Sequence, residues 1–265
     1  MRIVIQHEIE IEVGEGVPRA VQHLLLTPQS SNVQTVAEWQ LEAPGMDGAA
    51  GFIDAFGNRA HLASQTKPEP TMRVVATGAV ETHDLNGVVG RLGRDPVPAL
   101  FRRVTPLTKP AGAIVSKFRA APKDGKARIE LLHALMERVG EVLEDGAAQT
   151  QAQDEQAQAQ GRQTASPADH AHAFIGAARA LGIPARCVTG YLSPPDGTPA
   201  SFHVWAEAWD DRLGWIAFDC TLNICPTDRH VRVAAGLDAA SAAPVRSVPM
   251  LGAPKMLRVE AEAAQ

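Results

Sequence analysis

The sequence predicts an α+β chain in which a β-sandwich precedes a core made of a helix packed on an antiparallel sheet. The first 85–90 residues hold short apolar runs of period two with Gly and Pro between them, which is typical of a sandwich. Residues 129–143 then follow a helical apolar period, and a second helical pattern begins at 167. Two extended runs separated by a polar turn at 210–214 come last. Strands, then helices, then strands favour α+β over repeated parallel βαβ units.

Composition limits the classes of function. The chain has 265 residues, of which 45% are apolar, so it can bury a sizeable core in one large or two small domains. A formal charge of −5 gives no reason to expect nucleic-acid binding, and no apolar run reaches the length of a membrane span. The N-terminus turns polar too early for a signal peptide. Three cysteines without zinc-type spacing indicate free thiols in the cytoplasm and no metal or cofactor.

The N-terminal region reads as a series of short strands. A hairpin is expected within 52–62, turning at Gly57-Asn58. The other expected strands cover 3–13, 21–26, 33–41 and 72–81.

Three parts follow from these patterns. We expect the sandwich over residues 1–90, a Gly- and Pro-rich linker over 91–122, and the core over 123–265. Within the core, the Ala- and Gln-rich segment 146–163 has no apolar face to bury, so it is expected to be a mobile loop or a frayed helix. The tail after Pro244 shows little pattern.

The second helix has clear start and stop signals. Ser166 is expected at the N-cap, with Pro167 at the first helical position and Asp169 completing a capping motif. Gly182 is expected to end the helix, with Pro184 just beyond it.

The extended runs that follow carry a histidine and an aspartate. Residues 201–209 and 215–219 are predicted to form a hairpin, and a last strand is expected over 230–234. In either of two close registers, Asp219 lies opposite or diagonal to His203, within reach of a hydrogen bond. A carboxylate in that position fixes the tautomer of the imidazole and raises its basicity. An ordinary buried pair that holds the hairpin together is the alternative interpretation.

Several ordered motifs resemble one family. They are Asp169-His170-Ala171-His172, Leu181-Gly182-Ile183-Pro184-Ala185-Arg186, Gly190-Tyr191, His203-Val204-Trp205-Ala206-Glu207, Gly214-Trp215, Phe218-Asp219 and Asp228-Arg229-His230-Val231-Arg232-Val233. Together they are similar to the bacterial transglutaminase-like family, whose papain-like core follows a β-sandwich; Asp54-Ala55-Phe56-Gly57-Asn58 resembles part of that sandwich.

The resemblance implies a Cys-His-Asp triad, which this sequence matches only in part. His203 and Asp219 match the family's histidine and aspartate. The family's cysteine begins its helix, where the helix dipole favours a thiolate. At that position this chain has Pro167, whose side chain cannot attack a carbonyl.

Two classes of function remain open. The first is a pseudoenzyme that binds a peptide or protein partner in the remnant groove. The second is an acyl-transfer enzyme, amidase- or protease-like, that uses Ser166 or a displaced cysteine with His203 and Asp219. Capping alone explains Ser166, and Cys225 has no evident base in the sequence. A metal site formed by His170, His172 and His203 is less favoured than helix packing. Either function is compatible with a homo-oligomer.

Overall fold

The computed structural model describes residues 1–120, 125–153, 165–195 and 199–264. Its main elements, in chain order, are β1 (Arg2–Glu12), β2 (Arg19–Thr27), β3 (Gln34–Glu42), β4 (Ala50–Ile53), β5 (Arg59–Thr66), β6 (Thr71–Thr82), β7 (Val88–Gly90), α1 (Gly112–Val115), α2 (Gly125–Gln153), α3 (Pro167–Ala180), β8 (Ala185–Leu192), β9 (Ser201–Asp210), β10 (Gly214–Phe218), β11 (His230–Gly236), β12 (Val245–Val248) and β13 (Lys255–Ala264). Among the described residues, no helix is long and apolar enough to cross a membrane.

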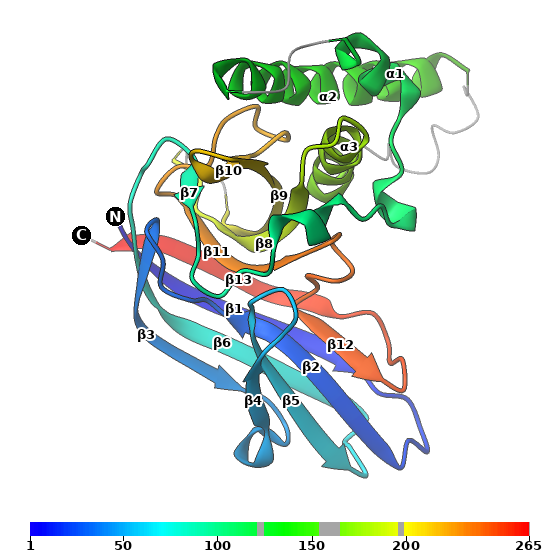
Figure 1. Ribbon diagram of the computed structural model, residues 1–265. Coiled ribbons are helices and arrows are strands. Elements are labelled where there is room, and N and C mark those ends of the chain that lie inside the picture. The colour runs from blue at the N-terminus through cyan, green and yellow to red at the C-terminus, as the bar shows by residue number, and fades with distance from the viewer. Residues whose placement is uncertain (121–124, 154–164, 196–198, 265) are drawn as a thin grey trace.

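Two four-stranded antiparallel sheets form the predicted sandwich. Their strand orders are β13-β1-β6-β3 and β12-β2-β5-β4. The period-two pattern of β1 turns Ile9 and Ile11 inward, where they meet Leu24 and Leu26 of β2. The sandwich forms the lower half of the molecule in Figure 1. The alternation along β1 therefore predicts which of its faces is buried.

The core is a five-stranded antiparallel sheet with the order β11-β8-β9-β10-β7. Helix α3 packs against β8 and β9, and α2 packs in turn on α3 (Figure 1). Phe174 of α3 contacts Phe218 of β10 in a stacked pair. Every residue of β8 is buried, because the other face of the sheet is covered as well, by a cluster that includes Phe101 and Trp215. The predicted α+β architecture, a papain-like core behind a sandwich, is thus confirmed.

The domain bounds need correction at their ends. Strands β12 and β13 pair with β2 and β1, so residues 245–264 lie in the sandwich and not in the core expected over 123–265. The expectation that 230–234 would be the last strand is therefore wrong. Conversely, β7 pairs with β10 and belongs to the core sheet. Strands at a sheet edge with one exposed face carry little apolar pattern, which explains why the sequence of the tail does not predict β12 and β13. Of the segment 146–163, residues 146–153 continue α2, and the rest lies outside the described residues.

Two side-chain amides join the sandwich to the free edge of β11. Asn58 accepts from the backbone N–H of Ala235 and donates to its carbonyl, at 2.8 Å each. Gln34 does the same for Arg232, again at 2.8 Å. Both amides are buried, at 2% and 1% exposed. They satisfy backbone groups that an edge strand would otherwise leave unpaired.

A buried charge network joins three strands of the core sheet. The carboxylate of Glu207 on β9 accepts from Nε of Arg186 on β8 at 2.6 Å and from Nε of Arg232 on β11 at 2.9 Å. Arg186 also pairs with Asp95 of the linker at 2.9 Å and lies over the ring of Trp215. Burial alone would raise the pKa of Glu207, but the two guanidinium groups hold that pKa below its usual range. The network ties β8, β9, β11 and the linker into one unit.

We predict that Asn58→Ala lowers the free energy of unfolding by about 2–4 kcal/mol, because it leaves the buried N–H and C=O of Ala235 without partners. Denaturant unfolding measures the change. Asn32→Ala, which truncates an exposed asparagine, is the control and should stay within about 0.5 kcal/mol of the native chain. Equal costs for both variants would contradict the role of Asn58 at the β11 edge.

Candidate functional site

The start of α3 has the predicted capping geometry. Ser166 has extended backbone dihedrals, and its Oγ accepts from the backbone N–H of Asp169 at 3.2 Å. Asp169 completes the capping box, since one carboxylate oxygen accepts both the backbone N–H and the hydroxyl of Ser166, at 2.8 and 2.7 Å. Pro167 is the first helical residue, where its missing N–H has no cost. The hydroxyl proton of Ser166 is therefore donated to a carboxylate and not to an imidazole.

The hairpin of β9 and β10 brings His203 and Asp219 together. The turn is fixed by Asp210, whose carboxylate accepts from the backbone N–H groups of Arg212 and Leu213. In the resulting register Phe218 lies opposite Ala206, which puts Asp219 on the face of His203. Nε2 of His203 lies 2.7 Å from Oδ2 of Asp219. The predicted hydrogen bond is thus confirmed, while a catalytic role for the pair stays a prediction.

Asp219 is the centre of a larger hydrogen-bonded group. Its Oδ1 accepts from the backbone N–H groups of Thr221 and Leu222, and its Oδ2 also lies 3.2 Å from Nε2 of His230. Burial alone would raise the pKa of Asp219, but the hydrogen bonds from His203 and His230 outweigh it and hold that pKa well below its usual range. The carboxylate is therefore charged and accepts from both rings.

The proton positions of the two rings follow from their partners. The backbone N–H of Thr227 donates to Nδ1 of His230, so the ring proton of His230 is on Nε2, facing Asp219. Nε2 of His203 likewise donates to the charged carboxylate. In the neutral ring, Nδ1 of His203 then keeps its lone pair, as the base of a triad requires. The sequence pattern predicts only that His230 begins a strand within one of the family motifs, and does not predict its hydrogen bond to Asp219.

The same three side chains have the composition of a metal site. Ligand atoms of His203, Asp219 and His230 all lie within 4.8 Å of one another. A metal on Nε2 of His230 would require its proton to move to Nδ1, where it would face the N–H of Thr227. The donor set therefore fits a hydrogen-bonded cluster better than a metal centre.

The other histidines and cysteines form contacts of their own. His172 is buried and accepts from the backbone N–H of Ala239 at 2.9 Å, while His170 is bonded to the carbonyl of Ser166. Cys187 and Cys220 are buried, and burial raises the pKa of both thiols. Cys225 is half-buried, and its Sγ lies 3.5 Å from Nε2 of His133. The expectation that Cys225 has no evident base is therefore wrong. The sequence gives no sign of this base, because His133 is 92 positions away from Cys225.

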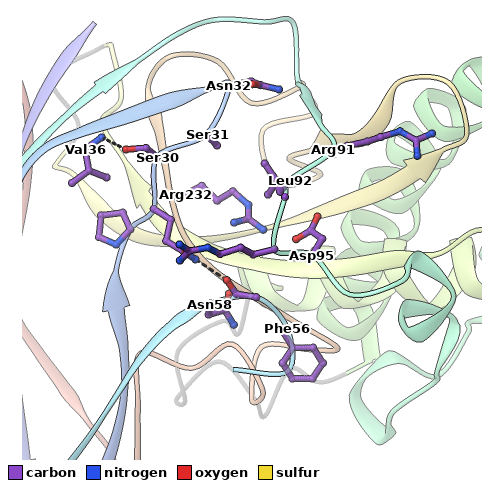
Figure 2. A pocket seen from close by; sticks show the side chains of 15 residues that line it. Ser30, Ser31, Asn32, Val36, Phe56, Asn58, Arg91, Leu92, Asp95 and Arg232 are labelled. Carbon is purple, nitrogen blue, oxygen red and sulfur yellow. Dashed lines mark hydrogen bonds between the residues drawn. The ribbon is translucent and has the colours of Figure 1, made fainter. Parts of the chain in front are cut away.

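A cavity of about 550 Å³ lies between the sandwich loops and the linker. Figure 2 shows Ser30, Asn58 and Asp95 around it. Neither His203 nor Asp219 lines this cavity. It is therefore a space at the seam between the two halves of the molecule and does not belong to the His203 cluster.

Comparison with known proteins gives the same division of the chain. Residues 114–220 match the model of the transglutaminase-like superfamily, and residues 3–81 match the bacterial transglutaminase-like N-terminal region. The part of the chain from 114 to 220 belongs to the transglutaminase-like superfamily. An uncharacterised protein of Mycobacterium leprae (strain TN) is 23% identical over 240 residues, which cover 84% of each chain.

One solved structure supports the fold. A presumed cysteine protease from Cytophaga hutchinsonii superposes with a TM-score of 0.59 at 21% identity, over 100% of this chain and 90% of the other. The periplasmic domain of TgpA from Pseudomonas aeruginosa reaches a TM-score of only 0.24 at 15% identity, over 82% and 88% of the two chains, so that likeness carries no argument. Membership of the superfamily explains the retained hairpin and leaves the chemistry of this chain to be decided by its own residues.

We predict that Asp219→Asn lowers the free energy of unfolding by about 2–4 kcal/mol at neutral pH, because the amide puts an N–H or an uncharged oxygen against two N–H donors. The pKa of Asp219 is lower in the folded chain than the ordinary value near 4, so its charge stabilises the fold above about pH 4. That contribution is lost as the pH falls from about 4 through the folded pKa.

Urea unfolding of both chains from pH 7 down to pH 3 tests this. The difference in free energy of unfolding between the native protein and Asp219→Asn should be constant near neutral pH and should become smaller below about pH 4. Asp211→Asn, at an exposed carboxylate paired with Arg128, is the control and should cost about 1 kcal/mol or less. A difference that is independent of pH would mean that the charge of Asp219 does not stabilise the fold.

Proposed function

We propose that this chain is a transglutaminase-like pseudoenzyme, which binds a peptide or protein partner in its remnant groove without forming a covalent intermediate. The observation that carries the proposal is the start of α3: its N-cap is Ser166 and its first residue is Pro167, so no thiol stands at the helix N-terminus. Acyl transfer by this architecture uses a thiolate at that point, with a histidine as its proton partner.

The alternative, an acyl-transfer enzyme that uses Ser166, has little support in the geometry. A serine nucleophile needs a base within hydrogen-bond reach. The hydroxyl of Ser166 donates instead to Asp169 at 2.7 Å and accepts from the backbone of the same residue. Both interactions belong to the capping box and would be lost if the hydroxyl turned toward another base.

A displaced cysteine has no better support. Cys187 and Cys220 are buried. The base beside Cys225 is His133 and not His203, and burial raises the pKa of the Cys225 thiol. Thiols with a raised pKa supply little thiolate at neutral pH.

The parts that remain favour binding. The N–H of Ala168 in the first turn of α3 suits a peptide carbonyl, since Pro167 has no N–H and those of Asp169 and His170 are bonded to Ser166. His203 and Asp219 are 4% and 0% exposed, so they contribute to the rigidity of the site more than to its surface. We infer that the partner contacts the start of α3 through its backbone.

We predict that the native chain does not hydrolyse or transfer small acyl amides, and that Pro167→Cys restores a reactive thiol. The new cysteine lies at the helix N-terminus, where the dipole lowers its pKa. Iodoacetamide labelling at mildly acidic pH measures this in a Cys225→Ser background, which removes the other accessible thiol. Ala180→Cys, at the exposed C-terminal end of the same helix, is the matched control and should label at least about 10-fold more slowly.

Two outcomes would overturn the proposal. One is amide turnover by the native chain that Ser166→Ala or Cys225→Ser abolishes, because the chain would then be an enzyme. The other is equal labelling of Pro167→Cys and Ala180→Cys, because the helix start would then have lost the electrostatics of the family's site.

Binding at the start of α3 is tested separately with a displayed library of random peptides. We expect the native chain to enrich related peptides, and Ala168→Trp to abolish the enrichment by filling the space beside the helix N-terminus. Ala180→Trp, at the exposed far end of the same helix, should bind as the native chain does. Enrichment that survives Ala168→Trp, or none above an empty support, would refute binding at this surface.

A further inference from the structure

A cysteine–histidine pair lies outside the His203 cluster. Cys225 comes directly after Ile224, whose backbone bridges to Asp219, and His133 lies on α2. The Sγ–Nε2 distance of 3.5 Å fits a hydrogen bond from a thiol. Nothing in the proposed binding function uses this pair.

The proton of His133 can be placed from its second contact. Nδ1 lies 3.3 Å from the carbonyl oxygen of Ile129, and a carbonyl only accepts, so Nδ1 carries the hydrogen. Nε2 then faces the thiol with its lone pair. The ring is also held edge-on against Phe218, with 5.4 Å between centroids. His133 is therefore an oriented base with its acceptor nitrogen on Cys225.

Access distinguishes Cys225 from the other two thiols. Cys187 and Cys220 are 0% and 4% exposed, whereas Cys225 is half-buried at a loop. Gly87 packs against it, since a Cβ there would come within 3.2 Å of Sγ. Two exposed apolar side chains lie close to it in sequence or in space: Ile224 precedes it, and Leu85 belongs to the Gly87 loop. Of the three cysteines, Cys225 is thus the most exposed.

We propose that Cys225 is a modification site for small neutral or cationic disulfides, with His133 as the base for thiol–disulfide exchange. His133 Nε2 takes the thiol proton as Sγ attacks one sulfur of the disulfide, and the S–S bond of the disulfide breaks. The leaving thiolate takes the proton from His133. One S–S bond forms as another breaks, so no further oxidant is needed.

The surroundings explain both the need for a base and the charge of the preferred disulfide. Burial and the nearby Asp84 raise the pKa of Cys225, so the thiol is protonated at neutral pH and reacts slowly unless a base removes its proton. Asp84 is exposed and its carboxylate accepts from the backbone N–H of Asn86, which restricts the position of a charge that acts on Cys225. A fixed negative charge disfavours anionic disulfides.

The test uses the full chain with cystamine and glutathione disulfide, followed by mass spectrometry of the intact protein and of its peptides. We expect one cystamine adduct, on Cys225, and none in Cys225→Ser. His133→Gln should slow the reaction at pH 7 by about 10-fold or more, which is within the range of general-base effects. His170→Gln, at another helix histidine, is the control and should react at the native rate. Glutathione disulfide should react more slowly than cystamine, and Asp84→Asn should narrow that difference.

Three results would overturn the proposal. They are adducts on Cys187 or Cys220 in place of Cys225, a native rate in a His133→Gln chain that melts at the native temperature, and faster reaction with glutathione disulfide than with cystamine. If His133→Gln does not fold, nitrogen-15 spectra of native His133 decide the matter. A proton on Nε2 would exclude it as the base, and a proton on Nδ1 supports it. The outcome does not depend on the proposed binding function.

Discussion

The carboxylate of Glu207 lies between the guanidinium groups of Arg186 and Arg232 at the centre of the core sheet, where its side chain is fully buried. A buried charge costs several kcal/mol unless its partners are in place, so the strands that carry these residues have few alternative registers. A slip of β9 by one residue would turn Glu207 to the other face and remove both arginines. The register in turn puts His203 opposite Gly190 and leads the next strand to Asp219. The geometry of the His203 cluster therefore depends on a charge network that takes no part in it.

The same network extends into the sandwich. Arg232 binds Glu207 through its side chain, while its backbone is bound by Gln34. Asn58 holds the same strand three residues further along. In effect, two amide side chains take the place of a neighbouring strand, which lets the edge of β11 be buried without extending the sheet. The two halves of the molecule are thus joined by specific polar contacts as well as by apolar packing.

Periodicity and end signals were enough to predict most elements, because they are local. The alternation of β1 and the sequence Ser166-Pro167-Ala168-Asp169 each determine a structure within a dozen residues. The hydrogen bond between His203 and Asp219 could also be predicted, since a short turn limits the register. Contacts between distant segments could not be predicted: neither the return of β13 to β1 nor His133 beside Cys225 leaves a pattern in any window of the sequence. The contact of His230 with Asp219 spans only 11 positions, but they form no short hairpin turn that would limit its register.

The pairing of β13 with β1 affects how the chain can be made. Ala264 is aligned with Arg2, so β1 gains one of its two neighbours only after all of the core between β1 and β13 has been synthesised. Pairings this distant in sequence slow folding, because a long loop must close before they form. During synthesis β1 and β2 each have a free edge where the late strands will add, and an unpaired edge is where strands of other chains associate. The sandwich is therefore begun before the core is synthesised and completed after it.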